Sequence, residues 1–126
     1  MKKGSTAAGR ARRSPATSAV LEWAIEACRD RKAADGVVLD LRPLSDAADF
    51  FLVVSGTSDT HVRAIAEHVE ATLRGHGVTA YAVEGLRAGR WVLLDYVDLV
   101  VHVFHPTLRA FYQLEALWGD APQRQV

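Results

Sequence analysis

The stretch Arg90–His105, RWVLLDYVDLVVHVFH, constrains the fold more than any other part of the chain. It holds two apolar runs, at residues 91–94 and 99–104, on either side of the joint DYVD at residues 95–98. Short runs rich in Val, Phe and Trp around a tight joint predict an antiparallel β-hairpin. Both runs are apolar at nearly every position. This is typical of a strand covered on both faces, or of one whose second face awaits a partner.

Helical and strand patterns on both sides of this hairpin indicate a single α/β domain. The expected elements are a helix from residue 17 or 18, strands at 37–42 and 49–55, a helix between 58 and 75, a strand at 78–84, the two hairpin strands and a helix at 107–118. The order α-β-β-α-β-β-β-α predicts a mixed sheet of about five strands packed with three helices across residues 17–120. Residues 1–16 are expected to be a disordered basic arm, and residues 121–126 a tail.

The net charge of zero is the sum of two unlike parts. Residues 1–16 hold five Lys or Arg and no acid, so residues 17–126 hold ten basic residues against all fifteen acidic ones. An acidic folded domain is poorly suited to bind phosphate backbones, and better suited to dock on a basic protein. The arm has two interpretations, a contact with nucleic acid or another acidic surface, or a solvated start that keeps the chain in solution.

Cysteine and hydropathy exclude several classes of protein. Cys28 is the only cysteine, so an internal disulfide is excluded, and no Cys/His cluster suggests a structural zinc. No uncharged apolar run approaches the roughly 18–20 residues that cross a bilayer. The start of the chain has no secretory signal, so we expect a cytoplasmic protein. We also expect no membrane partner, no cofactor and no small-molecule substrate.

Two polar patterns are candidate sites of catalysis. The turn Ser55–Asp59, SGTSD, resembles a corner whose free N–H groups bind a phosphate. Capping of the next helix by Thr57 or Ser58 is the simpler interpretation, and the Lys of nucleotide-binding loops is missing. Asp95 and Asp98 could be ligands of a divalent ion, but two ligands on one strand face need i,i+2 spacing. A metal-dependent nucleotidyltransferase-like enzyme is therefore the alternative function.

The histidines do not suggest a metal site. His102 and His105 lie three apart in a strand and should point to opposite faces. His61 and His68 lie seven apart on a helix, two turns of about 5.4 Å each, which is long for one ion. No nucleophile-elbow pattern is present either, so we predict no catalytic residue and no enzyme.

The hairpin is the best candidate for an interaction surface. On its first strand Trp91, Leu93 and Asp95 point one way, and Val92 and Leu94 point the other. Three helices cannot easily cover both faces of five strands, so one sheet face is expected to be open to a partner or to a second copy. A Trp in a strand is a common core residue, but the accessible acidic turn beside Trp91 favours a docking anchor.

Five segments in this order carry a resemblance to a known family: VVLDLR (37–42), DFFLVVSGTSDTHVRAIAEHV (49–69), EG (84–85), RWVLLDYVDLVVHVFHP (90–106) and FYQLEALW (111–118). Together they resemble the ribosomal silencing factor family, also called Iojap-like, over about residues 18–120. The resemblance implies a fold similar to nucleotidyltransferases without the catalytic acids. It also implies binding to the large ribosomal subunit through universal large-subunit protein fourteen, a block of subunit association that represses translation, and homodimers.

The resemblance further implies a set of partner-binding residues on and beside the hairpin: Trp91, Leu93, Asp95, Tyr96, Asp98 and Glu84. One position departs from the family pattern, because many relatives have Gly where this chain has Val97. If that position requires a positive φ, the Val side chain costs roughly 1–2 kcal/mol.

Overall fold

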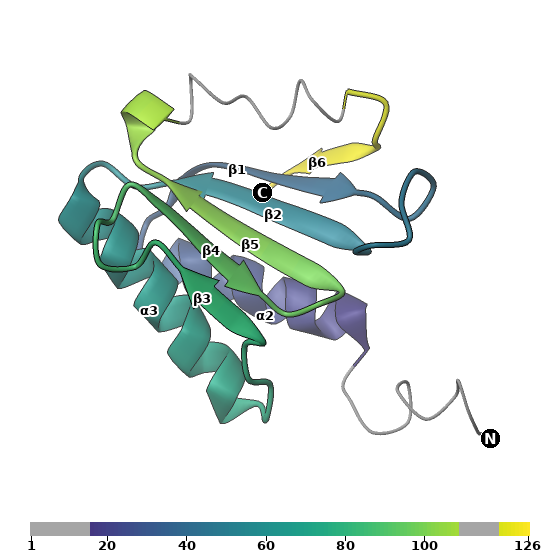
Figure 1. Cartoon of the computed structure of the whole chain (residues 1–126), viewed down its shortest axis with the longest axis horizontal. Coiled ribbons are helices and arrows are strands. Elements are labelled where there is room, and N and C mark those ends of the chain that lie inside the picture. Colours follow the sequence, from purple (N-terminus) through teal and green to yellow (C-terminus); the bar gives the residue numbers. More distant parts are fainter. Residues whose placement is uncertain (1–15, 109–118) are drawn as a thin grey trace.

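The chain forms a six-stranded sheet with α2 and α3 against one face, in a computed structural model that describes residues 16–108 and 119–126 (Figure 1). The elements in chain order are α2 (Thr17–Asp30), β1 (Ala34–Asp40), β2 (Phe50–Ser55), α3 (Asp59–Gly75), β3 (Ala82–Glu84), β4 (Trp91–Asp95), β5 (Leu99–Phe104) and β6 (Gln123–Gln125). The predicted single α/β domain with a mixed sheet is confirmed.

The sheet is mixed because one pair of neighbouring strands is parallel. The strand order is β3-β4-β5-β2-β1-β6, with β2 and β5 parallel and all other neighbours antiparallel. The predicted hairpin is confirmed, since Trp91 lies opposite Phe104 and Asp95 lies opposite Val100. β5 and β2 occupy the middle of the sheet, which explains why both are apolar at nearly every position.

The first residues of α3 illustrate how the sequence positions a helix. Ser58 is the N-cap, and its Oγ accepts a hydrogen bond from the His61 backbone N–H at 3.1 Å. Near the other end, Glu70 and Arg74 form an i,i+4 ion pair at 3.4 Å. The buried residues of α3 recur at helical spacing: Val62, Ile65, Ala66, Val69 and Leu73.

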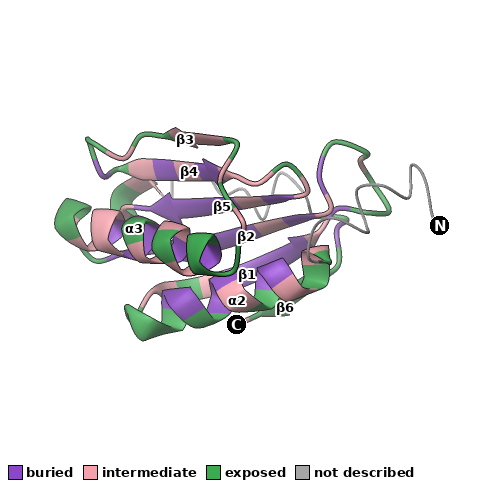
Figure 2. Cartoon of the chain, turned by 90° about the horizontal axis from the view of Figure 1, so that it is seen from below, coloured by how far each residue is buried: buried purple, intermediate pink, exposed green. Residues whose placement is uncertain are grey.

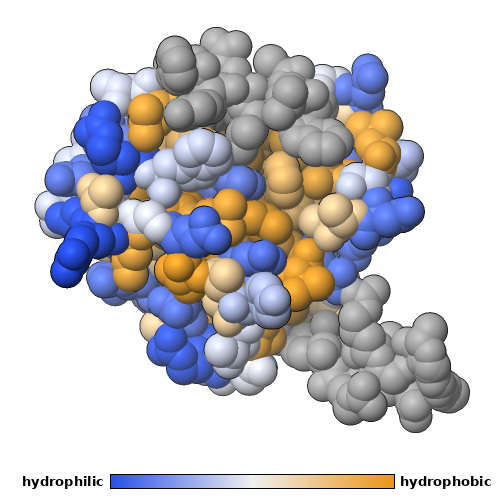
Figure 3. Space-filling view, viewed as in Figure 1, coloured by the Kyte–Doolittle hydropathy of each residue, from blue (hydrophilic) through white to orange (hydrophobic). Residues whose placement is uncertain are grey.

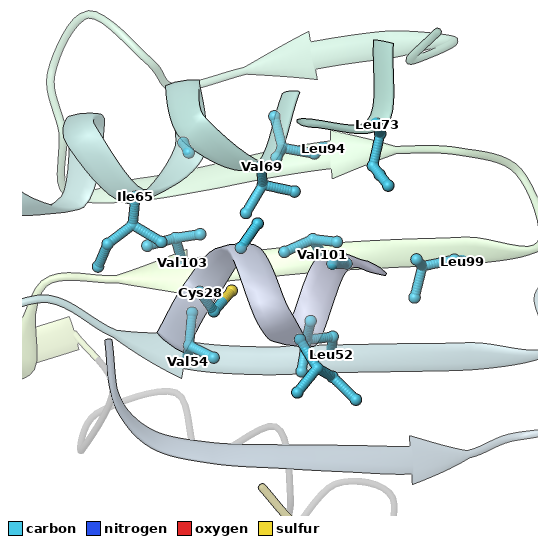
Figure 4. Packing of buried hydrophobic residues seen from close by; sticks show 14 of the residues in the cluster. Cys28, Leu52, Val54, Ile65, Val69, Leu73, Leu94, Leu99, Val101 and Val103 are labelled. Atoms are coloured by element: carbon cyan, nitrogen blue, oxygen red, sulfur yellow. The ribbon is translucent and has the colours of Figure 1, made fainter. Parts of the chain in front are cut away.

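The two helices bury their apolar sides against the same face of the sheet. Figure 2 shows the buried surfaces of α2 and α3 turned toward the strands, with exposed residues on their outer sides. In Figure 4 side chains of both helices meet those of β2, β4 and β5 in one layer. Cys28 lies in this layer, and burial raises the pKa of its thiol to about 12, so it behaves as a small apolar residue.

The structure adds one strand to the five that were expected. Residues 121–126, expected as a tail, contribute β6, which pairs antiparallel with β1 and covers its outer edge. Val126 then packs against the core, and its N–H donates to the Gly36 carbonyl at 3.0 Å. Arg124 reaches Glu22 of α2 at 2.6 Å. The sequence QRQ gave no sign of a strand because it has no apolar alternation.

Two other expectations differ from the structure or lie outside it. The strand expected at 78–84 is limited to β3, and Gly77, with φ of 83°, starts the irregular segment before it. Residues 106–108 are helical where the third helix was predicted to begin. The rest of that prediction, and the predicted disorder of the arm up to residue 15, lie outside the described residues.

No helix in the described part of the chain is both long enough and apolar enough to cross a membrane.

Gly85, in the EG segment, allows the chain to pass close to β4. Its φ is 81°, and a Cβ at this position would collide with the Trp91 carbonyl oxygen. Gly77 has nearly the same φ but open space around the Cβ position. We expect Gly77→Ala to lower the free energy of unfolding by about 1 kcal/mol, and Gly85→Ala by more than about 2 kcal/mol, because only the second adds a clash. Urea denaturation of the two variants measures the difference, and equal losses would contradict the close approach.

Candidate functional site

The face of the sheet opposite the helices carries alternate residues of β4. Val92 and Leu94 are fully buried in the layer between the sheet and the helices. Trp91, Leu93 and Asp95 lie on the other face and are half-buried. The predicted division of this strand into two faces is therefore confirmed. We call the face that carries Trp91 the open face because these three side chains of β4 keep accessible surface on it, although Val53 and Phe104 on the same face are buried.

Neighbouring strands extend the open face on both sides of β4. Glu84 of β3 is paired with Leu93, which is paired in turn with His102 of β5. Asp95 is paired with Val100, which is paired with Phe51 of β2. Phe51 and Val100 are half-buried, so apolar surface continues across three strands. Figure 3 shows apolar residues gathered over the strands at the centre of the view, with polar residues around them.

Trp91 is held in place within the monomer while part of it stays accessible. Its indole packs on Phe104 with ring centroids 4.9 Å apart, and its Nε1 donates a hydrogen bond to His102 Nδ1 at 3.1 Å. One part of the Trp91 side chain is therefore packed like a core residue, and another part stays accessible like a docking anchor. The internal contacts orient the ring, and the remaining surface is available on the open face.

His102 is the residue on this face whose role the sequence did not indicate. Its side chain is 4% exposed, and burial lowers its pKa from 6.5 to about 4. Because Nδ1 accepts the indole N–H, the neutral ring carries its proton on Nε2, which has no hydrogen-bond partner in the described residues. The Phe51 ring lies edge-on at 4.7 Å. The strand register, which pairs residue 102 with Leu93 and Val53 and so makes Trp91 and Phe51 its diagonal neighbours, is the signal that could have revealed this role.

The turn between β4 and β5 is tight and strained. Tyr96 N–H donates to the Leu99 carbonyl at 2.8 Å, and Asp98 N–H donates to the Tyr96 carbonyl at 2.9 Å. Val97, between the last two, has φ of 71°. A hydrogen bond between residues two apart around a positive φ is the rare, strained form of the γ-turn. Val97 therefore does occupy a position that favours Gly.

Tyr96 does not share the open face with Trp91. Its ring packs against the layer that contains the helices, and its hydroxyl is buried without a partner among the described residues. Burial, with a smaller contribution from the negative charge of Glu70, raises the pKa of Tyr96 to about 12. Of the six residues implied by the family resemblance, the structure groups Trp91, Leu93, Asp95 and Glu84 on the open face, leaves Asp98 in the turn and places Tyr96 on the helix side of the sheet.

The two acidic residues beside the turn accept backbone hydrogen bonds that hold the turn in place. Asp95 Oδ1 accepts the Val97 N–H at 2.8 Å, and the carbonyl of Asp98 accepts the N–H of Asp49 at 2.7 Å. No group of three or more His, Cys, Asp or Glu residues that could hold a metal occurs within residues 16–108 and 119–126.

The Ser55–Asp59 corner is occupied by capping contacts. Besides the Ser58 cap, the Thr57 N–H donates to His61 Nδ1 at 2.9 Å, and His61 Nε2 lies 2.7 Å from the Arg31 carbonyl. N–H groups that would face a phosphate are thus engaged by side chains of the same chain. These contacts favour the capping interpretation over the anion site.

Comparisons with known proteins agree with the resemblance seen in the sequence. The model of the family described as ribosomal silencing factor during starvation matches residues 14–126. The ribosomal silencing factor of Bacillus subtilis is 45% identical over 103 residues, which cover 82% of this chain and 87% of that protein. A crystal structure from Chromobacterium violaceum has a TM-score of 0.79 at 39% identity, over 81% of this chain and 85% of that one. Another, from Bacillus halodurans, has a TM-score of 0.77 at 38% identity, over 86% and 99%.

The strain at Val97 predicts a stabilising substitution. Val97→Gly should raise the free energy of unfolding by about 1 kcal/mol, because relief of the positive-φ strain outweighs the extra freedom that Gly gives the unfolded chain. Chemical denaturation measures the change. A variant less stable than the parent would show that the turn does not store this strain.

The low pKa of His102 predicts a loss of stability in mild acid. The unfolded chain binds a proton on this residue below pH 6.5, whereas the folded chain resists protonation until about pH 4. The contribution is therefore complete above pH 6.5 and is lost as the pH falls toward 4. It amounts to about 2 kcal/mol between pH 7 and pH 5.

Denaturant unfolding at several pH values tests this effect, with His102→Phe as the control. The variant should show a flatter profile over the same pH range, because it removes the titrating group and keeps an aromatic ring. Parallel profiles for the parent and the variant would assign the pH dependence to other groups.

Proposed function

Because the chain belongs to the ribosomal silencing factor family, we propose that it binds the large ribosomal subunit through universal large-subunit protein fourteen and blocks association with the small subunit. Such a factor represses translation in the cytoplasm by occupying space. It needs a rigid body attached at the right place and no catalytic residue.

The observation that carries the proposal is the open face around Trp91 and Leu93. Aromatic and aliphatic side chains grouped on a rigid sheet, with acidic groups nearby, have the composition of a protein-docking surface. On this face His102 and Phe104 of β5 are buried, so the part of the hairpin that a partner can reach is the half-buried row Trp91, Leu93 and Asp95 of β4, whereas Val92 and Leu94 are sealed into the core.

Charge supports a basic protein as the partner. Residues 17–126 carry fifteen acidic and ten basic side chains, and Glu84 and Asp95 border the apolar part of the open face. Complementary charge accelerates encounter with a basic protein, and the same negative charge disfavours contact with bare RNA. The contact should therefore be made to a ribosomal protein rather than to the ribosomal RNA around it.

A docking role predicts weaker ribosome binding when the apolar centre is removed. Trp91→Ala and Leu93→Ser should each weaken binding to purified large subunits, by about 2 kcal/mol or more for the Trp. Co-sedimentation with large subunits, with and without small subunits present, measures both binding and the block of subunit joining.

Two controls separate binding from folding. Thermal unfolding reports the loss of internal contacts in Trp91→Ala, and the same measurement shows whether Leu93→Ser is folded. Glu84→Gln on the open face is matched by Glu67→Gln on the exposed side of α3, and only the first should weaken binding. Undiminished capture by folded Trp91→Ala and Leu93→Ser would refute the proposal.

A further inference from the structure

Three large apolar side chains are strongly exposed in the described part of the chain, and all three lie at the same end of the sheet. They are Leu44 at 45%, Tyr81 at 79% and Val97 at 53% exposure. Single exposed apolar residues scattered over a surface are ordinary, but their concentration at one place is a mark of an interaction site.

Backbone hydrogen bonds join the three segments that carry these residues. The Tyr81 N–H donates to the Asp95 carbonyl at 2.7 Å, at the end of β4. Val97 follows in the turn, and the Asp98 carbonyl accepts the Asp49 N–H at 2.7 Å. Leu44 lies in the loop between β1 and β2 that ends at Asp49, at the same end of the sheet as the turn (Figure 1).

The loop of Leu44 is itself rigidly attached to the sheet. The Leu44 N–H donates to the Leu41 carbonyl at 2.9 Å, and the Leu41 N–H donates to the Asp49 carbonyl at 2.8 Å. Leu41 is buried, so the loop is fixed at its base while Leu44 projects from it. The exposed side chains are thus presented by a fixed frame.

The charge of this end indicates what kind of surface would cover it. Residues 40–50 and 95–99 contain five Asp and a single basic residue, Arg42. Arg42 is already engaged, because its Nη2 lies 2.7 Å from Asp40 Oδ2 and its guanidinium covers the Phe50 ring at 4.9 Å. A partner that buries the apolar side chains here would therefore be favoured by positive charge around them.

We propose that Leu44, Tyr81 and Val97, here called the tip surface, form a second contact for the basic large-subunit protein that binds the open face. The two surfaces adjoin at Asp95, whose side chain lies on the open face and whose carbonyl accepts the Tyr81 N–H. The partner would then wrap around the end of β4 and contact the sheet face and the tip surface together. This inference rests on the proposed function and adds Leu44 and Tyr81, which the family resemblance did not indicate.

Substitutions at the tip surface test the inference without disturbing the fold. Leu44→Ser and Tyr81→Ser should each raise the Kd for purified large subunits by about tenfold, as expected when an interface side chain is removed. Tyr81→Phe keeps the ring and should bind like the parent. Ala88→Ser, in the exposed loop before β4, is a control outside the tip surface and should also bind like the parent. Circular dichroism and thermal unfolding verify that each variant is folded.

The possible results separate the tip surface from the proposed function. The tip contact is overturned if folded Leu44→Ser and Tyr81→Ser bind large subunits like the parent while Leu93→Ser binds more weakly. The proposed function is then left standing. Failure of the parent chain to bind overturns both. If Tyr81→Ser changes the sedimentation of the free protein from dimer to monomer without altering ribosome binding, a second copy covers the tip surface and the inference is wrong. It is also wrong if Tyr81→Ser loses its effect once residues 1–15 are deleted, because the basic arm would then be the occupant.

Discussion

The architecture depends on the pairing of β5 with β4 on one side and with β2 on the other. These two ladders, one antiparallel and one parallel, fix the register of the hairpin against the rest of the sheet. Because side chains alternate along a strand, the register sends Val101 and Val103 to the helices, and His102 and Phe104 to the face that carries Trp91. A slip of one residue would exchange these sets, burying an imidazole among aliphatic side chains. The core and the docking face are therefore specified by the same backbone hydrogen bonds.

Most of the fold was predictable because local and global signals agree. Apolar residues at helical spacing specify α3, Ser58 caps it, and the two runs of the hairpin flank a joint too short for anything but a turn. The alternation of Trp91 and Leu93 with Val92 correctly predicts that these side chains lie on opposite faces of β4. A positive φ at Val97 could also be anticipated from the departure from the family pattern.

Features that depend on long-range register were not predictable. β6 is polar, and it is a strand only because β1 offers an open edge to it. Tyr96 follows the alternation of β4 onto the helix side, although its place beside a turn indicated an accessible ring. The contact of His102 with the indole requires knowledge that residues 91 and 102 lie within reach across the hairpin. The strand β6 and the positions of Tyr96 and His102 all depend on which residues meet across the sheet.

The hydrogen bond from the Trp91 indole to His102 has a consequence for the energetics of recognition. Immobilising a rotamer-rich side chain at an interface costs about 0.5–1.5 kcal/mol, and a free surface Trp would incur that cost when a partner arrives. Here the ring is already oriented by His102 and stacked on Phe104. The ordering penalty is met during folding, so the anchor is preorganised and its contacts can contribute more fully to affinity.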